Sequence, residues 1–471
     1  MSEALKRARR MQTLAELDRL AADLDTWQQA RRDADTLDGT YRGQYDSQLK
    51  AIVGEVTVAV EAVREKLSVS IDALPTPQVY ARLSRHDRQI IWIRRAWDFF
   101  RAKFDQRSDS SLRGALSAAD EVLWSCYKPF FQRSGVTRPP APLPYIEFDY
   151  LPSAVLASQG HQIDRLAEGD EGPLAGYFDS LPVPVLRLPP AVVSAPWALA
   201  LIAHEVGHFL MPLLDRESPY LPTFRAALAD AVTRAGGGDE DRKNWSRWAP
   251  EIFADWFAVL AVGSWAVWAI AQYELTEEAR MRTPKTFYPS PAIRLFLLAE
   301  IARVHGLAPP DAIDGVPADE QTLDHRIATE VAAATLLKIP GFDQPLSELV
   351  AFRKADFEDP AGGAGFIRRW STALLDGRKE TPKRDVRSAR LLAAATAQAW
   401  KEMSETSAEP QQLARMNNIR ANAFPWIVAS GELDTRAAVK PPPLGPSGKS
   451  LKDRLLDATD DDLFLGARGA N

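Results

Sequence analysis

The stretch Trp197-Ala-Leu-Ala-Leu-Ile-Ala-His204-Glu205-Val-Gly-His208-Phe-Leu-Met211 decides how the rest of the chain is interpreted. It carries the pattern His-Glu-x-x-His within a run that is otherwise almost entirely apolar, which indicates a buried helix. Residues four apart share a face of a helix, so the His204 and His208 side chains can converge on one point. Two imidazoles placed in this way suit Zn²⁺, and Glu205 beside them is a candidate general base.

The alternative is a core helix whose histidines bond to neighbouring carbonyl groups. Burying polar groups without partners costs roughly 2–7 kcal/mol, so a buried helix carries them only for a reason. The chain has 6 histidines in 471 residues, which makes a chance occurrence of the pattern rare. We expect Ser194 to cap the helix, Pro196 to lie in its first turn and Pro212 to end it soon after His208.

A second informative stretch is Trp248-Ala-Pro-Glu251-Ile-Phe-Ala-Asp255. Pro250 starts a helix well, and Glu251 and Asp255 are four apart, so they lie on the same face. The rest of this helix is apolar, so its carboxylates require buried partners or a cavity, and a zinc ion with its imidazoles would provide such partners. The alternative is a capping glutamate followed by a salt-bridged aspartate.

These two stretches resemble the gluzincin metallopeptidases, in which two helix histidines and a downstream glutamate bind zinc. The matching pattern is His204-Glu205-x-x-His208 followed by Glu251-x-x-x-Asp255. The resemblance implies that His204, His208 and Glu251 are the zinc ligands. It agrees with a role for Asp255 as the acceptor of a hydrogen bond from a ligand imidazole, which fixes the tautomer of the ring.

A third segment, Tyr288-Pro289-x-x-x-x-Arg294, is similar to the His-Pro-x-x-x-x-Arg segment of CAAX-type and HtpX-like membrane endopeptidases, with Tyr in place of His. Amide hydrolysis requires a donor that meets the developing oxyanion. We expect Tyr288 to be this donor, with Arg294 as the second candidate. His305 and His325 are the alternative candidates for a metal ligand, if one of the three expected zinc ligands does not bind zinc.

Three protein ligands leave a fourth zinc position open, which is typical of a catalytic site. Glu205 would take a proton from the attacking water and pass it to the leaving amine. The sequence therefore predicts a zinc-dependent endopeptidase that acts on a protein or peptide substrate. The alternative function is a non-catalytic helical scaffold or binding protein with a structural or degenerate metal site, which has no need of a base such as Glu205.

Composition excludes several other classes. The net charge of −6 argues against a general nucleic-acid binder, and Cys126 is the only cysteine, which fits a reducing compartment. The basic start of the chain is not followed by an apolar run, so we expect no signal peptide and a cytoplasmic protein. The run Trp256–Ala271 is shorter than the roughly 20 residues of a membrane span, so we expect a buried core helix.

The predicted fold is mainly α with a small β-sheet (α+β), in which a zincin-like metallopeptidase core is flanked by helical N- and C-terminal regions. The predicted divisions are a helical N-terminal region (1–135), the core (136–310), a helical C-terminal region (311–435) and a flexible tail (436–471). Strands are expected at 145–150 and 181–188. Pro184 predicts an edge position for the second strand, where it can hold an extended peptide, and the alternative is a plain core strand. The helical flanks can recognise the substrate or a regulatory protein partner.

Overall fold

The structure, a computed structural model, describes residues 3–38, 46–68, 74–136, 141–147, 153–155, 183–217, 219–308, 322–358, 365–380, 385–406, 409–431, 450–459 and 463. Helices account for most of these residues, and the strands form one three-stranded and one two-stranded sheet. The expectation of a mainly helical chain with a small β-sheet is therefore confirmed.

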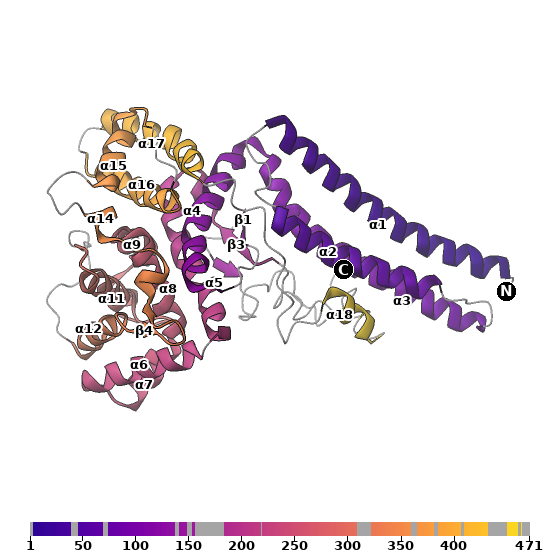
Figure 1. Cartoon of the computed structure of the whole chain (residues 1–471), viewed down its shortest axis with the longest axis horizontal. Coiled ribbons are helices and arrows are strands. Elements are labelled where there is room, and N and C mark those ends of the chain that lie inside the picture. The colour runs from indigo at the N-terminus through magenta and orange to yellow at the C-terminus, as the bar shows by residue number, and fades with distance from the viewer. Residues whose placement is uncertain are drawn as a thin grey trace.

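Three long helices form an arm that projects from one side of a helical body (Figure 1). They are α1 (Glu3–Asp38), α2 (Asp46–Ser68) and α3 (Thr76–Asp105), and the short 3₁₀ helix η1 (Gln106–Ser108) follows them. Apolar side chains at helical spacing on α3 are buried in one cluster with those of α1 and α2. The last of the three, α3, begins at Thr76. Pro77 lies in its first turn, where a helix requires no N–H donor.

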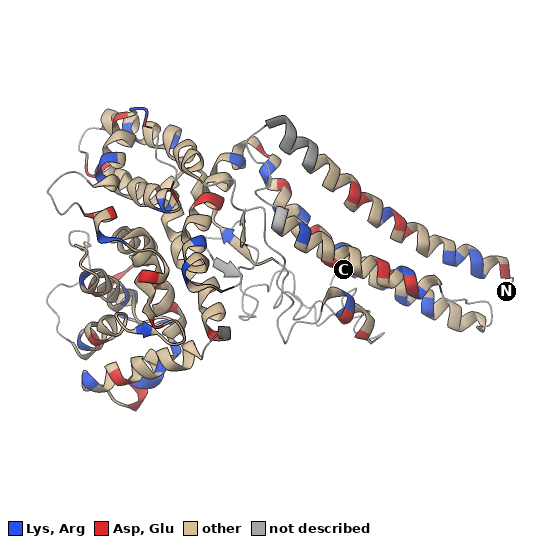
Figure 2. Cartoon of the chain, viewed as in Figure 1, with Lys and Arg blue, Asp and Glu red and all other residues tan. Residues whose placement is uncertain are grey.

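Charges along the arm are mixed. Figure 2 shows acidic and basic residues interspersed along the described parts of α1, α2 and α3. Several of them pair between helices, as Arg101 does with Asp23 and Arg64 with Asp18. A stripe of one sign, as nucleic-acid binding requires, is not seen on these described parts in this view.

The three-stranded sheet connects the arm to the body. Its strands are β1 (Leu143–Ile146), β2 (Ser153–Val155) and β3 (Val185–Leu188), in the order β1-β3-β2. β3 pairs parallel to β1 and antiparallel to β2, so it is the central strand. The prediction that Pro184 marks an edge strand was wrong, because Pro184 directly precedes the ladder and its carbonyl accepts a hydrogen bond from the amide of Leu143 at 2.8 Å.

The two faces of β3 are buried against different clusters. Val185 packs with the arm, whereas Leu186 and Leu188 pack with the body. Consecutive residues of a strand point to opposite faces of the sheet. Because both faces of β3 are buried, its sequence is nearly all apolar.

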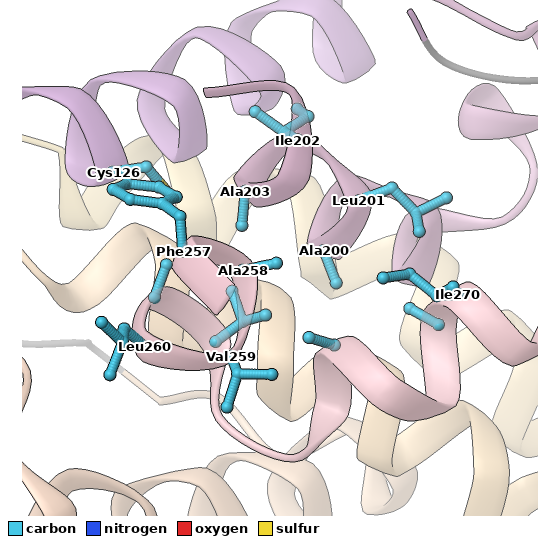
Figure 3. Packing of buried hydrophobic residues seen from close by; sticks show 14 of the residues in the cluster. Cys126, Ala200, Leu201, Ile202, Ala203, Phe257, Ala258, Val259, Leu260 and Ile270 are labelled. Carbon is cyan, nitrogen blue, oxygen red and sulfur yellow. The ribbon is translucent and has the colours of Figure 1, made fainter. Parts of the chain in front are cut away.

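The body is built from helices that run from α4 to α17. Its first part contains α4 (Ser110–Ser134), η3 (Pro190–Val193), η4 (Pro196–Leu201), α5 (Ile202–Glu217), α6 (Tyr220–Arg234), α7 (Asp239–Arg247), α8 (Ala249–Val262), α9 (Trp265–Glu274), α10 (Glu278–Met281) and α11 (Pro291–Val304). Figure 3 shows Cys126, Ala203 and Phe257 meeting in the packed interior. These residues belong to α4, α5 and α8, and each is almost completely buried.

The apolar run Trp256–Ala271 is not one continuous helix. α8 ends at Gly263, which has a φ of 67°, and α9 starts at Trp265. Most of the run is buried, as expected for core helices. Among the described residues, one helical stretch is long and apolar enough for a membrane span, Pro196–Asp215, and 83% of its most apolar window is buried within the fold. Core helices of soluble proteins have this property.

The rest of the body consists mainly of further helices. Its elements are α12 (Leu323–Ala334), β4 (Lys338–Ile339), β5 (Gln344–Pro345), α13 (Leu346–Leu349), α14 (Lys354–Phe357), α15 (Phe366–Asp376), α16 (Ser388–Ser404) and α17 (Glu409–Ser430). β4 and β5 form a separate antiparallel pair. Within the stretch expected to be a tail, Leu451–Asp457 form a further helix, α18, whose Leu451 and Leu455 are buried.

Candidate metal centre

The first element of the site is helix α5. It begins at Ile202, directly after the 3₁₀ helix η4, and it continues through Pro212 to Glu217. The prediction that Pro212 ends the helix was wrong. A proline inside a helix removes one hydrogen bond, but here Met211 and Leu214 on either side of it are buried in the core, which offsets this loss. Ser194 does not cap the helix either, since its hydroxyl donates to the carbonyl of Ala191 at 3.3 Å.

The helical spacing places His204 and His208 together, as predicted. Their Nε2 atoms lie 3.1 Å apart, and Glu251 Oε2 lies 3.3 Å from the Nε2 atom of His204 and 3.1 Å from that of His208. Zn²⁺ binds imidazole nitrogen and carboxylate oxygen at about 2.0–2.2 Å with tetrahedral geometry, which separates neighbouring ligand atoms by about 3.3 Å. The three donor atoms thus have the spacing that zinc requires, and both imidazoles are buried.

Helix α8 brings Glu251 to this point. Pro250 and Glu251 lie in its first turn, as the sequence predicted, and Asp255 follows one turn later on the same face. The backbones of α5 and α8 approach closely at Gly207, which lies between the two histidines in the sequence. This close approach allows a short distance between side chains that come from different helices.

Asp255 contacts the first histidine from behind. Its Oδ1 lies 2.8 Å from the Nδ1 atom of His204, and its side chain is almost completely buried. A carboxylate at Nδ1 orients the ring so that Nε2 points toward Glu251 and His208. The geometry agrees with the orienting role expected for Asp255.

A chain of buried charges continues from Asp255. The Nε and Nη2 atoms of Arg294 each donate to Asp255 at 2.8 Å, and Nη1 donates to Glu274 at 2.6 Å. Lys285 then donates to the other oxygen of Glu274 at 2.6 Å. Arg294 and Glu274 are buried, whereas Lys285 is half-exposed at the outer end of this chain.

The sequence did not single out Glu274 or Lys285. A signal for Glu274 was present, because it is a lone carboxylate at the end of the apolar helix α9. The residue that pairs with it, Arg294, lies on α11, and no local spacing indicates that these two helices meet at this point.

Tyr288 lies between Arg294 and the three donor atoms. The guanidinium of Arg294 stacks 4.2 Å from the centre of the Tyr288 ring, and the Tyr288 hydroxyl is hydrogen-bonded to Glu251. Burial, together with the nearby charge of Glu251, raises the pKa of Tyr288 well above its ordinary value, so the hydroxyl keeps its proton. Of the two oxyanion candidates, Tyr288 reaches the donor cluster, whereas the guanidinium of Arg294 is bound to carboxylates.

Glu205 is buried next to His204 on α5. Its charge lies near enough to act on the pKa values of both His204 and Tyr288. The structure therefore brings together His204, Glu205, His208, Glu251, Asp255 and Tyr288, with Arg294 behind them.

The carboxylates control the protonation of His204. Burial alone would lower the pKa of this imidazole, but the hydrogen bonds to Asp255 and Glu251 outweigh burial and raise the pKa to about 10. Burial also acts to raise the pKa of Glu251, yet the adjacent histidines hold it well below its ordinary value. A divalent cation bound to Nε2 would replace that proton, because metal ligands must be deprotonated. The residues present therefore fit zinc.

The two alternative ligand candidates, His305 and His325, do not belong to the donor cluster. His305 Nε2 accepts a hydrogen bond from the indole N–H of Trp256 at 3.2 Å, and His325 Nδ1 lies 2.7 Å from the hydroxyl of Thr322 near the start of α12. Among the described residues, the cluster of possible metal ligands at this site contains only His204, His208 and Glu251.

Comparisons of the chain with protein-family models, with curated proteins and with solved structures find no match.

Proposed function

We propose that this protein is a zinc-dependent endopeptidase of the gluzincin type, with a zincin-like core around α5 and α8. The observation that carries the proposal is the convergence of His204 Nε2, His208 Nε2 and Glu251 Oε2, with donor atoms 3.1–3.3 Å apart and Glu205 beside them. Three protein donors on a tetrahedral ion leave one position for water, which distinguishes a catalytic zinc site from a closed structural one.

Each side chain has a defined task in this proposal. When bound, zinc supplies the Lewis acidity that polarises the scissile carbonyl and makes water acidic enough to react near neutral pH. Glu205 accepts the proton of the attacking water and delivers it to the leaving amine. The hydroxyl of Tyr288, which is protonated and close to Glu251, donates a hydrogen bond to the oxyanion as it develops.

The residues behind the site hold this arrangement in place. Asp255 fixes the ring of His204, and Arg294 fixes Asp255 through two hydrogen bonds. Arg294 is thus proposed as a positioning residue rather than an oxyanion donor. A cytoplasmic location belongs to the same proposal, since a single cysteine allows no disulfide within the chain, as is usual for a reducing compartment.

The test combines metal analysis with a search for cleaved products. Purified protein is expected to contain one zinc per chain and to cleave an unfolded protein such as casein, with activity lost in chelator and restored by zinc. Glu205→Gln should keep the zinc and lose at least ~100-fold in activity, as expected for a general base. Glu240→Gln, at an exposed glutamate on α7, is the matched control and should behave like the unaltered chain.

A proteomic comparison of new chain termini in cells that carry the unaltered protein or Glu205→Gln extends the test to a narrowly specific enzyme. Stoichiometric zinc with identical termini in both strains would support the scaffold alternative. Activity in Glu205→Gln equal to that of the unaltered chain would remove Glu205 as the base.

A further inference from the structure

The last described helix, α18, belongs to the C-terminal end of the sequence, but it lies against the arm, which belongs to the N-terminal end (Figure 1). It contacts both α2 and α3. Leu451 and Leu455, one helical turn apart, are 0% and 1% exposed and belong to the same apolar cluster as the arm helices. Residues more than 350 positions away therefore complete the core of the arm.

The start of α18 is held by a side chain of the arm. Glu55 on α2 accepts a hydrogen bond from the amide of Leu451 at 3.2 Å. The segment also caps itself, because the hydroxyl of Ser450 accepts from the amide of Asp453 at 3.1 Å. These bonds satisfy amides that have no partner within a helix.

The end of α18 is held by α3. The amide group of Gln89 donates to the carbonyl of Leu455 at 2.7 Å, and Arg85 donates to the carbonyl of Ala458. His86 fixes the Gln89 side chain, since its Nδ1 atom lies 2.8 Å from Gln89 Oε1. Gln89 is 1% exposed with α18 in place, so its amide and the carbonyl of Leu455 satisfy each other away from water.

This surface is therefore specific for a helix, because it offers an acceptor for the first amides and donors for the last carbonyls. α18 has only seven residues, whereas isolated helices shorter than about 12–15 residues are marginal in water. Its helical structure depends on the surface that it contacts. In the sequence, 18 residues separate Gly431 from Ser450, so the helix is covalently tethered to the body, and a tether makes its binding intramolecular.

We propose that α2 and α3 form a helix-binding site, that residues 450–459 are its tethered ligand, and that the same segment of a second copy binds there once the resident one is displaced. The ligand is a short helix with leucines at positions i and i+4, and its first amide and last carbonyls bond to side chains of the site. The site is separate from the metal centre, so this proposal is independent of peptidase activity.

The first experiment uses the full-length chain with Leu451→Asp and Leu455→Asp, which removes the resident helix from the site. A fluorescent peptide of residues 446–466 is titrated with this variant and with the unaltered chain, and its anisotropy is measured. The variant should bind the peptide at least tenfold more tightly, because no tethered competitor remains. Leu456→Asp changes a leucine on the half-exposed side of α18 and should behave like the unaltered chain.

Two further measurements test the specificity. A peptide that itself carries both aspartates should not bind. Gln89→Leu, added to the chain with Leu451→Asp and Leu455→Asp, should weaken peptide binding about tenfold. The proposal would be overturned if the double-aspartate variant and the unaltered chain bound the peptide equally well and both had a native circular-dichroism spectrum.

The second experiment does not depend on the folding of that variant. A specific protease site is inserted between Ala438 and Val439 and is cut after purification, so that the fold forms with the segment in place. Native mass spectrometry should show the C-terminal fragment bound and then replaced by labelled peptide in excess. A fragment that is lost at micromolar concentration, or one that never exchanges, contradicts the proposed site.

Discussion

Gly207 of α5 faces Ala254 of α8 so closely that a methyl group at position 207 would lie 2.7 Å from the Cα atom of Ala254. The same methyl group would lie 3.2 Å from the Cβ atoms of Ala254 and Phe257. Backbone atoms cannot move away as the end of a flexible side chain can. The distance between the histidines on α5 and Glu251 on α8 therefore depends on the absence of a side chain at Gly207.

Gly207→Ala should separate the two helices. Alanine favours a helix over glycine by about 1 kcal/mol, so stabilisation is expected wherever space is available. At position 207 we expect destabilisation by about 1–3 kcal/mol from overpacking, together with a loss of zinc affinity of at least ~10-fold. Urea unfolding and a competitive zinc chelator measure the two quantities.

Gly54→Ala provides the control, because no other atom lies within 4 Å of a methyl group on this exposed residue of α2. It should stabilise the protein by about 0.5–1 kcal/mol. If both substitutions stabilise the chain and zinc binding is unchanged, the close approach at Gly207 does not control the site.

Arg294→Lys should show that the buried charge chain positions the site. Lysine cannot make the paired bonds to Asp255 and the third bond to Glu274, so we expect a loss of about 3–5 kcal/mol in the free energy of unfolding. Zinc affinity should fall about 10–100-fold, as is typical when the partner of a metal ligand is disturbed. Arg303→Lys, at an exposed arginine on the same helix, should change stability by less than about 0.5 kcal/mol.

Local spacing was sufficient to predict the part of the site that each helix contributes. The pairs His204 with His208 and Glu251 with Asp255 follow from helical periodicity alone. Their meeting depends on the packing of α5 on α8, which Gly207 permits and which helical periodicity alone does not indicate. The contacts of Arg294 were not predictable, because its partners Asp255 and Glu274 lie 39 and 20 residues away on other helices.

The errors in the predicted fold also come from non-local contacts. Pro184 suggested an edge strand, but pairing with β1 and β2 on both sides of β3 is decided by segments that lie 30–42 residues earlier. The composition of the C-terminal stretch suggested a tail, whereas the order of α18 depends on Glu55 and Gln89 in the arm. The composition of a segment indicates whether it folds by itself, but it does not indicate whether another part of the protein binds and orders it.

Tyr288→Phe should separate catalysis from metal binding. The ring and its contact with Arg294 are kept, and only the hydroxyl bonded to Glu251 is removed. We expect kcat to fall about 100–1000-fold, as for the loss of one oxyanion donor, with KM and zinc content nearly unchanged. Turnover equal to that of the unaltered chain would assign Tyr288 a purely structural role.

Removal of the metal should lower the stability of the protein as well as its activity. A ligand that binds only the folded state at 100 times its Kd stabilises that state by about 2.7 kcal/mol. Dialysis against chelator should therefore lower the melting temperature, and added zinc should restore it. In Glu251→Gln the same treatment should have little effect, because one of the three donors has lost its charge. A chelator effect equal to that in the unaltered chain would require another third ligand.

His305 provides a test of pH dependence away from the metal centre. Its Nε2 atom accepts the indole N–H of Trp256, and burial lowers its pKa from 6.5 to about 4. Between these two values the unfolded chain binds a proton that the folded chain does not. The stability contributed by neutral His305 is therefore complete above pH 6.5 and is lost as the pH falls toward 4, by about 3 kcal/mol in total.

His305→Gln keeps an acceptor for Trp256 but removes the titrating group. The decrease in the free energy of unfolding between pH 7 and pH 4.5, measured by urea unfolding, should be about 2 kcal/mol smaller in this variant than in the unaltered chain. His325→Gln, at a partly exposed histidine on α12, should keep the decrease of the unaltered chain. If His305→Gln loses as much stability on acidification as the unaltered chain, the proton uptake responsible lies at other residues, and His305 titrates near its ordinary pKa because water reaches its ring.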